Sequence, residues 1–144
     1  MFASFAAALI ALLAAVTTPP LVVQAPDSPV RLDHAAVLIS DGNPPVLVYA
    51  ATNLTDNEFE QFTVLVFIFD EKGMLKARQV APGRRTLAAR ETKSSAMVLD
   101  GVAIEPTWLI VAGVNQAQKA GSESWWRGDL QSAATEAAAK QQRN

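Results

Sequence analysis

The sequence predicts an all-β domain: an antiparallel sandwich of about seven strands, with an apolar helix before it and a short helix after it. Apolar and polar residues alternate with a period of two between residues 30 and 39, as they do along a half-buried strand. Runs rich in β-branched and aromatic residues then recur, separated by turn-forming residues and without helical periodicity between them. Connections this short favour antiparallel neighbours over parallel strands joined by helices.

The composition indicates one domain and argues against several kinds of chemistry. Half of the 144 residues are apolar, which is enough for a core, and the net charge is −2. A charge this small gives no indication of a nucleic-acid partner. Cysteine is absent, so disulfides, thiol catalysis, thiolate metal sites and a lipid anchor on cysteine are excluded.

The N-terminal stretch has the features of an export signal. No charged residue precedes Asp27, and residues 2–16 form an apolar run that would span about 22 Å as a helix. That is shorter than a hydrocarbon core of about 30 Å, and a small-x-small site follows at Val23-Gln24-Ala25. We therefore expect residues 1–25 to be a signal peptide or apolar helix, and the protein to reach the periplasm, the cell envelope or the medium.

Two other interpretations of this stretch stay open. The start lacks Lys and Arg, and Pro26 fits poorly where a peptidase needs an extended, hydrogen-bonding backbone. The stretch could instead be an uncleaved anchor, which would be the protein's only contact with a membrane, or a structural helix that is buried in the fold.

Residues 26–129 are predicted to form the sandwich, and each element follows from a local pattern. Asp41 to Pro45 is a turn cluster, and residues 55–61 form a polar loop. Asp70-Glu71-Lys72-Gly73 places glycine where a type I turn followed by a bulge needs a positive φ, which predicts a hairpin. Residues 84–91 are predicted to be a crossing loop with a short strand. The strands are expected at residues 30–39, 46–53, 62–69, 74–80, 93–99, 108–114 and 123–127.

The tail, residues 130–144, is predicted to be a helix. Its apolar residues recur at helical spacing, although most of them are alanines that bury little surface. The stripe consists of Leu130, Ala133, Ala134, Ala137 and Ala138. Such a helix either docks on the sandwich or frays.

One stretch of the chain is similar to known exported domains. A V-x-V strand ends in Asn-x-Thr, and after a polar gap alternating apolar residues lead into F-D-x-x-G. The matching residues are Val46, Val48, Asn53-Leu54-Thr55, Val64, Val66, Ile68 and Phe69-Asp70-Glu71-Lys72-Gly73. This pattern resembles the FxLYM-type and related immunoglobulin- or fibronectin-III-like modules of exported bacterial proteins, which implies a β-sandwich and no catalytic residue. The chain departs from these modules at Ala89-Arg90-Glu91, where they often have Pro-Gly-Glu.

The residues that could carry catalysis do not combine into a recognisable centre. His34 is the only histidine, so it cannot form a multi-histidine metal site, and no serine lies in a G-x-S-x-G elbow. Asp56, Glu58 and Glu60 share one loop and would serve a hydrolase only opposite another carboxylate in a cleft. We therefore expect a protein that is not an enzyme and has no catalytic, cofactor-binding or metal site, with a small carboxylate-based hydrolase as an alternative.

Several short motifs have both a structural and a functional interpretation. Asp41-Gly42-Asn43 and Asp56-Asn57-Glu58 offer hard oxygen ligands for calcium, but they also fit turns. Asn53-Leu54-Thr55 is either a glycosylation sequon or the end of a strand. Arg127-Gly128-Asp129 spells the integrin-binding tripeptide, or it stops a strand and caps the tail helix.

Charge is unevenly divided along the chain. Between Asp27 and Glu71 there are eight acids and one base, whereas between Lys72 and Lys93 there are seven bases and one acid. Either the basic return strand pairs with the acidic loops beside it, or it presents a surface to an acidic partner, an anionic lipid or a cell-wall polymer. The candidate basic surface includes Lys76, Arg78, Arg84 and Arg85.

The clearest indication of a binding surface is a strand that is apolar on both faces. In residues 62–69, Leu65, Phe67 and Phe69 point away from the side that Val64 and Val66 occupy. A sandwich buries only one face of each sheet, so either another part of the chain covers the second face or a partner binds it. The cover would be the tail helix or the segment 19–26.

If that face is uncovered, it is an interface for another protein or for a second copy of the chain. The candidate interface comprises Leu65, Phe67 and Phe69, with Trp125 and Trp126 beside them, because tryptophan is a typical interface anchor. The sequence thus predicts a non-catalytic binding or scaffolding module of the periplasm or cell envelope. The alternative is a membrane-tethered subunit of an envelope complex.

Overall fold

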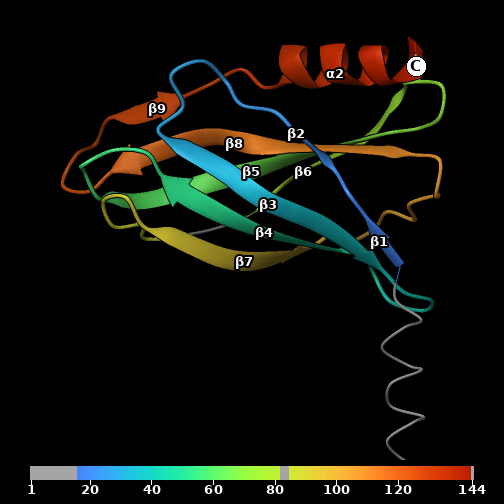
Figure 1. The fold of residues 1–144 in the computed structure, drawn as a ribbon, viewed down its shortest axis with the longest axis horizontal. Coiled ribbons are helices and arrows are strands. Elements are labelled where there is room, and N and C mark those ends of the chain that lie inside the picture. Colours follow the sequence, from blue (N-terminus) through green and yellow to red (C-terminus); the bar gives the residue numbers. More distant parts are fainter. Residues whose placement is uncertain (1–15, 82–84, 144) are drawn as a thin grey trace, which may run out of the picture.

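The computed structural model describes residues 16–81 and 85–143 (Figure 1). Nine strands and one helix are assigned within these residues. They are β1 (Val16–Thr18), β2 (Leu21–Val22), β3 (Val30–Ile39), β4 (Val46–Asn53), β5 (Phe59–Phe69), β6 (Leu75–Val80), β7 (Thr92–Val98), β8 (Leu109–Lys119), β9 (Trp125–Arg127) and α2 (Gln131–Arg143). The prediction of a mainly β protein with a short C-terminal helix is confirmed.

The strands form two sheets, which pack face to face across one core. Sheet A has the strand order β1-β3-β4-β7. In sheet B, β6 pairs with β5 and β5 with β8, while the other edge of β8 pairs with both β2 and β9. These pairings are antiparallel, except that β2 runs parallel to β8.

The core is built from alternate residues of each strand. Val37, Leu47 and Met97 form one cross-strand row on the inner face of sheet A. Sheet B contributes alternate residues of β5, among them Val64 and Val66, to the same buried cluster. The period-two pattern of the sequence therefore decides which side chains enter the core.

Two strands are longer than the sequence predicted. β5 begins at Phe59 instead of residue 62, because Phe59 pairs with Lys119 and also bridges to Leu87 in the crossing loop. The same pairing extends β8 to Lys119, beyond the end expected at residue 114. Most residues of these extensions are polar, so the sequence has no continuous apolar run there that would predict a strand.

The hairpin between β5 and β6 is confirmed. Gly73 has a φ of +80°, which is a conformation that favours glycine. The Asp70 carboxylate accepts hydrogen bonds from the backbone amides of Met74 and Lys72, at 2.9 Å each. The bond from Met74 contributes most to lowering the pKa of Asp70 below its ordinary value.

The sheets begin earlier in the chain than the sequence suggested. β1 pairs with β3 in sheet A and β2 pairs with β8 in sheet B, so both strands precede the domain start expected at residue 26. Most of the predicted apolar helix, residues 1–15, lies outside the described residues. The described part of the chain holds no helix with the length and apolarity needed to cross a bilayer.

Candidate interaction surface

The outer face of sheet B, where the sequence placed a candidate interface, is covered. Leu65, Phe67 and Phe69 lie in one buried cluster with Val111, and Phe67 is 0% exposed. The covering residues come from α2, from the residue just before it and from the segment before β3: Ala134 and Ala138, Leu130, and Ala25. The sequence left open whether this face is covered by another part of the chain or exposed to a partner. The structure shows that it is covered, which corrects the placing of Leu65, Phe67 and Phe69 on an exposed interface.

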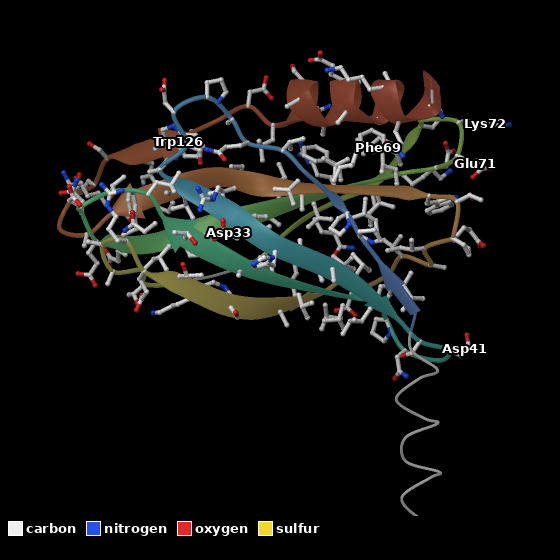
Figure 2. All side chains as sticks on the ribbon, in the orientation of Figure 1. Asp33, Asp41, Phe69, Glu71, Lys72 and Trp126 are labelled. Atoms are coloured by element: carbon white, nitrogen blue, oxygen red, sulfur yellow. The ribbon has the colours of Figure 1, made fainter. Side chains whose placement is uncertain are left out.

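Both ends of α2 are hydrogen-bonded to the rest of the molecule, and Figure 2 shows Glu71 near the C-terminal end of the helix. Asp129 caps the helix, since its Oδ1 accepts the backbone amide of Gln131 at 3.0 Å. The side chain of Gln131 accepts a hydrogen bond from Arg78 on β6 at 3.4 Å. Near the other end, Gln142 donates to the backbone carbonyl of Glu71 at 2.7 Å. The tail helix is therefore docked and not frayed.

The Arg127-Gly128-Asp129 tripeptide has a structural role at each position. Arg127 ends β9, and the backbone amide of Gly128 donates to the carbonyl of Asn115 at 2.9 Å. Asp129 is the cap of α2. These roles support the interpretation in which the tripeptide stops a strand and starts the helix.

Trp125 and Trp126 are half-buried on β9, which pairs with β8 of sheet B, and Figure 2 shows Trp126 on this strand. Trp126 packs against both the core between the sheets and the cluster beneath α2. A shallow depression of about 300 Å³ lies beside the pair and is also lined by Phe59 and Lys119. The interface that would have joined these tryptophans to Phe67 is absent because α2 and the 21–25 segment lie over Phe67.

The candidate basic residues that the structure describes lie on β6 and in the loop that follows it. Lys76 and Arg78 are exposed on β6, and Arg78 bonds to α2. The guanidinium of Arg85, in the loop after β6, lies 6.0 Å from the centre of the Tyr49 ring. This is a cation–π contact with a core residue of sheet A. Arg84 lies outside the described residues. The acidic and basic blocks meet at Arg90, whose Nε is 3.0 Å from Asp56 and lowers the pKa of that carboxyl.

Asn53, the first residue of the glycosylation sequon, is fully buried and used for structure. Its amide nitrogen donates to the backbone carbonyls of Asn57, Leu87 and Ala88, at 2.6, 3.2 and 3.1 Å. Its Oδ1 accepts from the amide and the hydroxyl of Thr55, at 2.9 and 2.8 Å. The side chain therefore joins the end of β4 to two loops, and a glycan has no access to it.

The carboxylates of the loop at residues 56–60 do not form a catalytic pair. Glu58 and Glu60 are exposed, and Asp56 pairs with Arg90. Within residues 16–81 and 85–143, no group of three or more His, Asp or Glu side chains could hold a metal ion. At the Asp41–Asn43 turn, the Asn43 side chain donates to Ser40 and to the carbonyl of Asp41, each at 3.3 Å, which is how a turn uses these residues.

Sheet A carries an apolar outer surface that no other part of the described chain covers. Because Val37, Leu47 and Met97 form an inner row, their neighbours along each strand point outward. The outward residues form three cross-strand rows on β3, β4 and β7, which we call the open face: Leu38, Val46 and Val98; Ala36, Val48 and Ala96; Ala50 and Ser94. Leu38 is 37% exposed and Val98 is 49% exposed. No helix of the described residues lies over these strands (Figure 1).

The middle of the open face is hollow because its central residues are small. A depression of about 590 Å³ is lined by residues that include Ala36, Val48, Ala50 and Ala96. Strand positions more often carry β-branched or aromatic residues, so three alanines together lower the surface locally. The larger side chains of Leu38, Val46 and Val98 stand at one end of the hollow.

Polar residues border the other end of the open face. A β-bulge interrupts the β3–β4 pairing between Leu32 and Ala35. The bulge gives β3 two residues, Asp33 and His34, where β4 has only Ala50. It therefore places a carboxylate and an imidazole at the edge of the hollow, which His34 also lines.

Hydrogen bonds hold this polar border in place (Figure 2). Asp33 accepts from the hydroxyl of Thr52 and from Nε of Arg31, the latter at 2.5 Å. The bond from Thr52 contributes most to lowering the pKa of Asp33. Thr52 also shares a hydrogen bond of 2.7 Å with Thr92 on β7. The open face thus runs from an apolar end to a charged and hydrogen-bonded end.

The sequence placed the candidate interface on the sheet whose outer face is covered, although the same apolar signal was present for sheet A. Residues 46–51 are apolar on both faces, as residues 62–69 are. Single-sequence patterning does not tell which of two such strands receives a covering helix, because the helix and the strand are far apart in the chain. The alanines of β3, β4 and β7 were also uninformative until the register placed them together.

Comparison of the chain with family models, with curated proteins and with solved structures finds no match.

Proposed function

We propose that this protein is a non-catalytic binding or scaffolding module that is exported to the periplasm or cell envelope. Its binding surface is the open face of sheet A. The observation that carries the proposal is the contrast between the two sheets: α2 covers the apolar outer face of sheet B, whereas Leu38, Val46, Val48 and Val98 have no cover among the described residues. Apolar surface that a fold leaves uncovered typically marks an interaction site.

The strand order supports an immunoglobulin- or fibronectin-like interpretation of the fold. In chain order, β3, β4, β5, β6, β7, β8 and β9 can be lettered A, B, C, C′, E, F and G. One sheet then contains A-B-E and the other C′-C-F-G, an immunoglobulin-like arrangement in which the fourth strand belongs to the C-F-G sheet. Such domains often serve recognition, but the site and not the fold decides the function.

The shape of the open face favours a helix of another protein as the occupant. Two copies placed face to face would enclose a void, since each face is hollow in the middle. A convex helical ridge fills such a hollow, and small residues let a helix approach the sheet closely. The hollow has the volume of a small-molecule site but is open to solvent over most of its extent, so a small ligand bound there would remain largely exposed. α2 covers the outer face of sheet B in the way we propose for the partner.

Two other functions have less support. A carboxylate-based hydrolase would need Asp56, Glu58 or Glu60 to face another carboxylate across a cleft, and Asp56 is instead paired with Arg90. A membrane-tethered subunit remains compatible with the proposed surface, because the tether and the open face would be separate features of the chain.

The experiment compares two lysine substitutions at exposed apolar positions. Val98→Lys places a charge on the open face, and Met74→Lys is the matched control in the β5–β6 turn, where Met74 is 63% exposed. Both variants should fold, with changes in unfolding free energy within about 0.5 kcal/mol. In extracts of the native cells, we expect the wild-type chain and Met74→Lys to migrate in a complex, and Val98→Lys to migrate at the monomer mass. A wild-type chain found only as monomer, or a complex that survives Val98→Lys, would contradict the proposal.

A further inference from the structure

We propose that residues 19–25 belong permanently to the functional protein, so that the small-x-small site ending at Ala25 is not the site of export processing. Any cleavage that matures the chain would then occur before Pro19. The inference concerns covalent processing and does not depend on the open face.

The first support is that this segment completes a sheet. Leu21 and Val22 form β2, which pairs in parallel with Val111 and Ala112 of β8. The backbone amide of Val23 continues the pairing, because it donates to the carbonyl of Ala112 at 3.0 Å. Without the segment, the polar backbone groups of this stretch of β8 would lie on an unpaired edge beside apolar surface.

The second support comes from two glycines that fit the segment closely. A Cβ on Gly113 would lie 2.6 Å from the carbonyl oxygen of Val23, and a Cβ on Gly128 would lie 2.6 Å from the Cβ of Ala25. Gly113 and Gly128 have no positive φ that would otherwise call for glycine. The close approach of the Val23 carbonyl accounts best for the missing side chain at Gly113, where the Leu130 side chain is the next neighbour at 3.0 Å. At Gly128 the approach of Ala25 acts together with the Trp126 ring, whose carbons would lie 2.8 Å from such a Cβ.

The third support is the apolar cluster beneath α2. Ala25 is 2% exposed in this cluster, and Leu21 and Val23 pack against it. The cluster also contains Leu65 and Phe67 of β5. Removing residues before Pro26 would take away one part of the cover of sheet B and would expose apolar surface that α2 alone does not reach.

Ala25 also leads directly into a fixed turn. Its carbonyl oxygen accepts the amide of Ser28 at 3.2 Å, and Asp27 between them has a φ of +62°. Processing peptidases act on the unfolded chain, so burial after folding does not by itself prevent cleavage. The residue after Ala25 supplies that protection. Pro26 lacks the backbone N–H donor, and its ring fixes φ, whereas a peptidase needs an extended, hydrogen-bonding backbone at this position.

The direct test is the N-terminal residue of the chain isolated from the cells that make it, determined by intact mass and N-terminal sequencing. We expect a first residue at position 19 or earlier. A first residue at any later position, including Pro26, would overturn the inference. This result is independent of whether the chain forms a complex, so failure here is distinguishable from failure of the proposed function.

A second measurement tests whether the segment is held in solution. Amide hydrogen exchange on the full chain should show the Val23 amide exchanging at least about a hundredfold more slowly than an unstructured amide. The same protection is expected for the paired amides of β5. The exposed amide of Gly42, in the turn before β4, is the unprotected reference. Exchange of Val23 at the rate of Gly42 would overturn the inference, because β2 would then not be a stable strand.

Discussion

Phe67→Asp should prevent the protein from folding. The Phe67 side chain is 0% exposed and stacks against Phe69, with ring centroids 6.4 Å apart, beneath the cover of sheet B. Loss of a buried phenylalanine costs about 3–5 kcal/mol, and an unpaired buried carboxylate adds several more. That sum approaches the whole stability of a typical domain, about 5–15 kcal/mol. Circular dichroism and denaturant titration of the purified variant measure the effect.

The control for this substitution is Val98→Asp, which introduces the same charge on the open face. Val98 is 49% exposed, so its carboxylate would remain in water and the unfolding free energy should change by less than about 1 kcal/mol. A Phe67→Asp variant with native spectra and stability would show that α2 does not cover sheet B. The interface that the sequence placed at Phe67 would then return as the better hypothesis.

Asn53→Ala should cause the second largest loss, about 3 kcal/mol of unfolding free energy. The side chain is fully buried and takes part in five hydrogen bonds that join β4 to the loops at residues 55–57 and 87–88. Alanine would leave the backbone amide of Thr55 without its acceptor, at about 1–3 kcal/mol for a group that water cannot reach. It would also remove one of the two donors to each of the carbonyls of Asn57, Leu87 and Ala88, at about 0.5–1.5 kcal/mol for each hydrogen bond. Chemical denaturation with an unchanged m-value would measure the loss.

Asn43→Ala is the matched control for this prediction. Asn43 lies in an exposed turn and its side chain makes two hydrogen bonds of 3.3 Å, so its loss should cost no more than about 0.5 kcal/mol. Equal stability of the two variants would mean that the Asn53 bonds are not formed in solution. The sequon would then be open to modification again.

Much of the fold follows from the sequence. The alternation at residues 30–39 and the β-rich run at 46–53 gave strands with the same bounds as β3 and β4. Glycine at position 73 correctly indicated a hairpin with a positive φ. These elements are local, since their patterns and turns are contained within a few neighbouring residues.

The rest depends on contacts between distant residues. Residues 16–25 carry the composition of an export signal, yet β2 forms because β8, some ninety residues later, offers an open edge, and because Gly113 on β8 and Gly128 after β9 leave room for the segment. The sequence left open whether Asn53 is a glycosylation site or a structural residue at the end of a strand. Its partners at Leu87 and Ala88 belong to a loop whose structure the sequence did not define. The choice between the two sheets likewise depended on where α2 docks, which no local pattern records.

The measurement that most directly tests the account is site-specific photo-crosslinking from the open face in the native cell. A photoreactive residue at position 98 or 48 should crosslink to one other protein, at a segment whose apolar residues recur every three or four positions. The same residue at position 74 should give no such product. A crosslink between two copies of this chain, or equal products from positions 98 and 74, would contradict the claim that the open face of sheet A receives a partner helix.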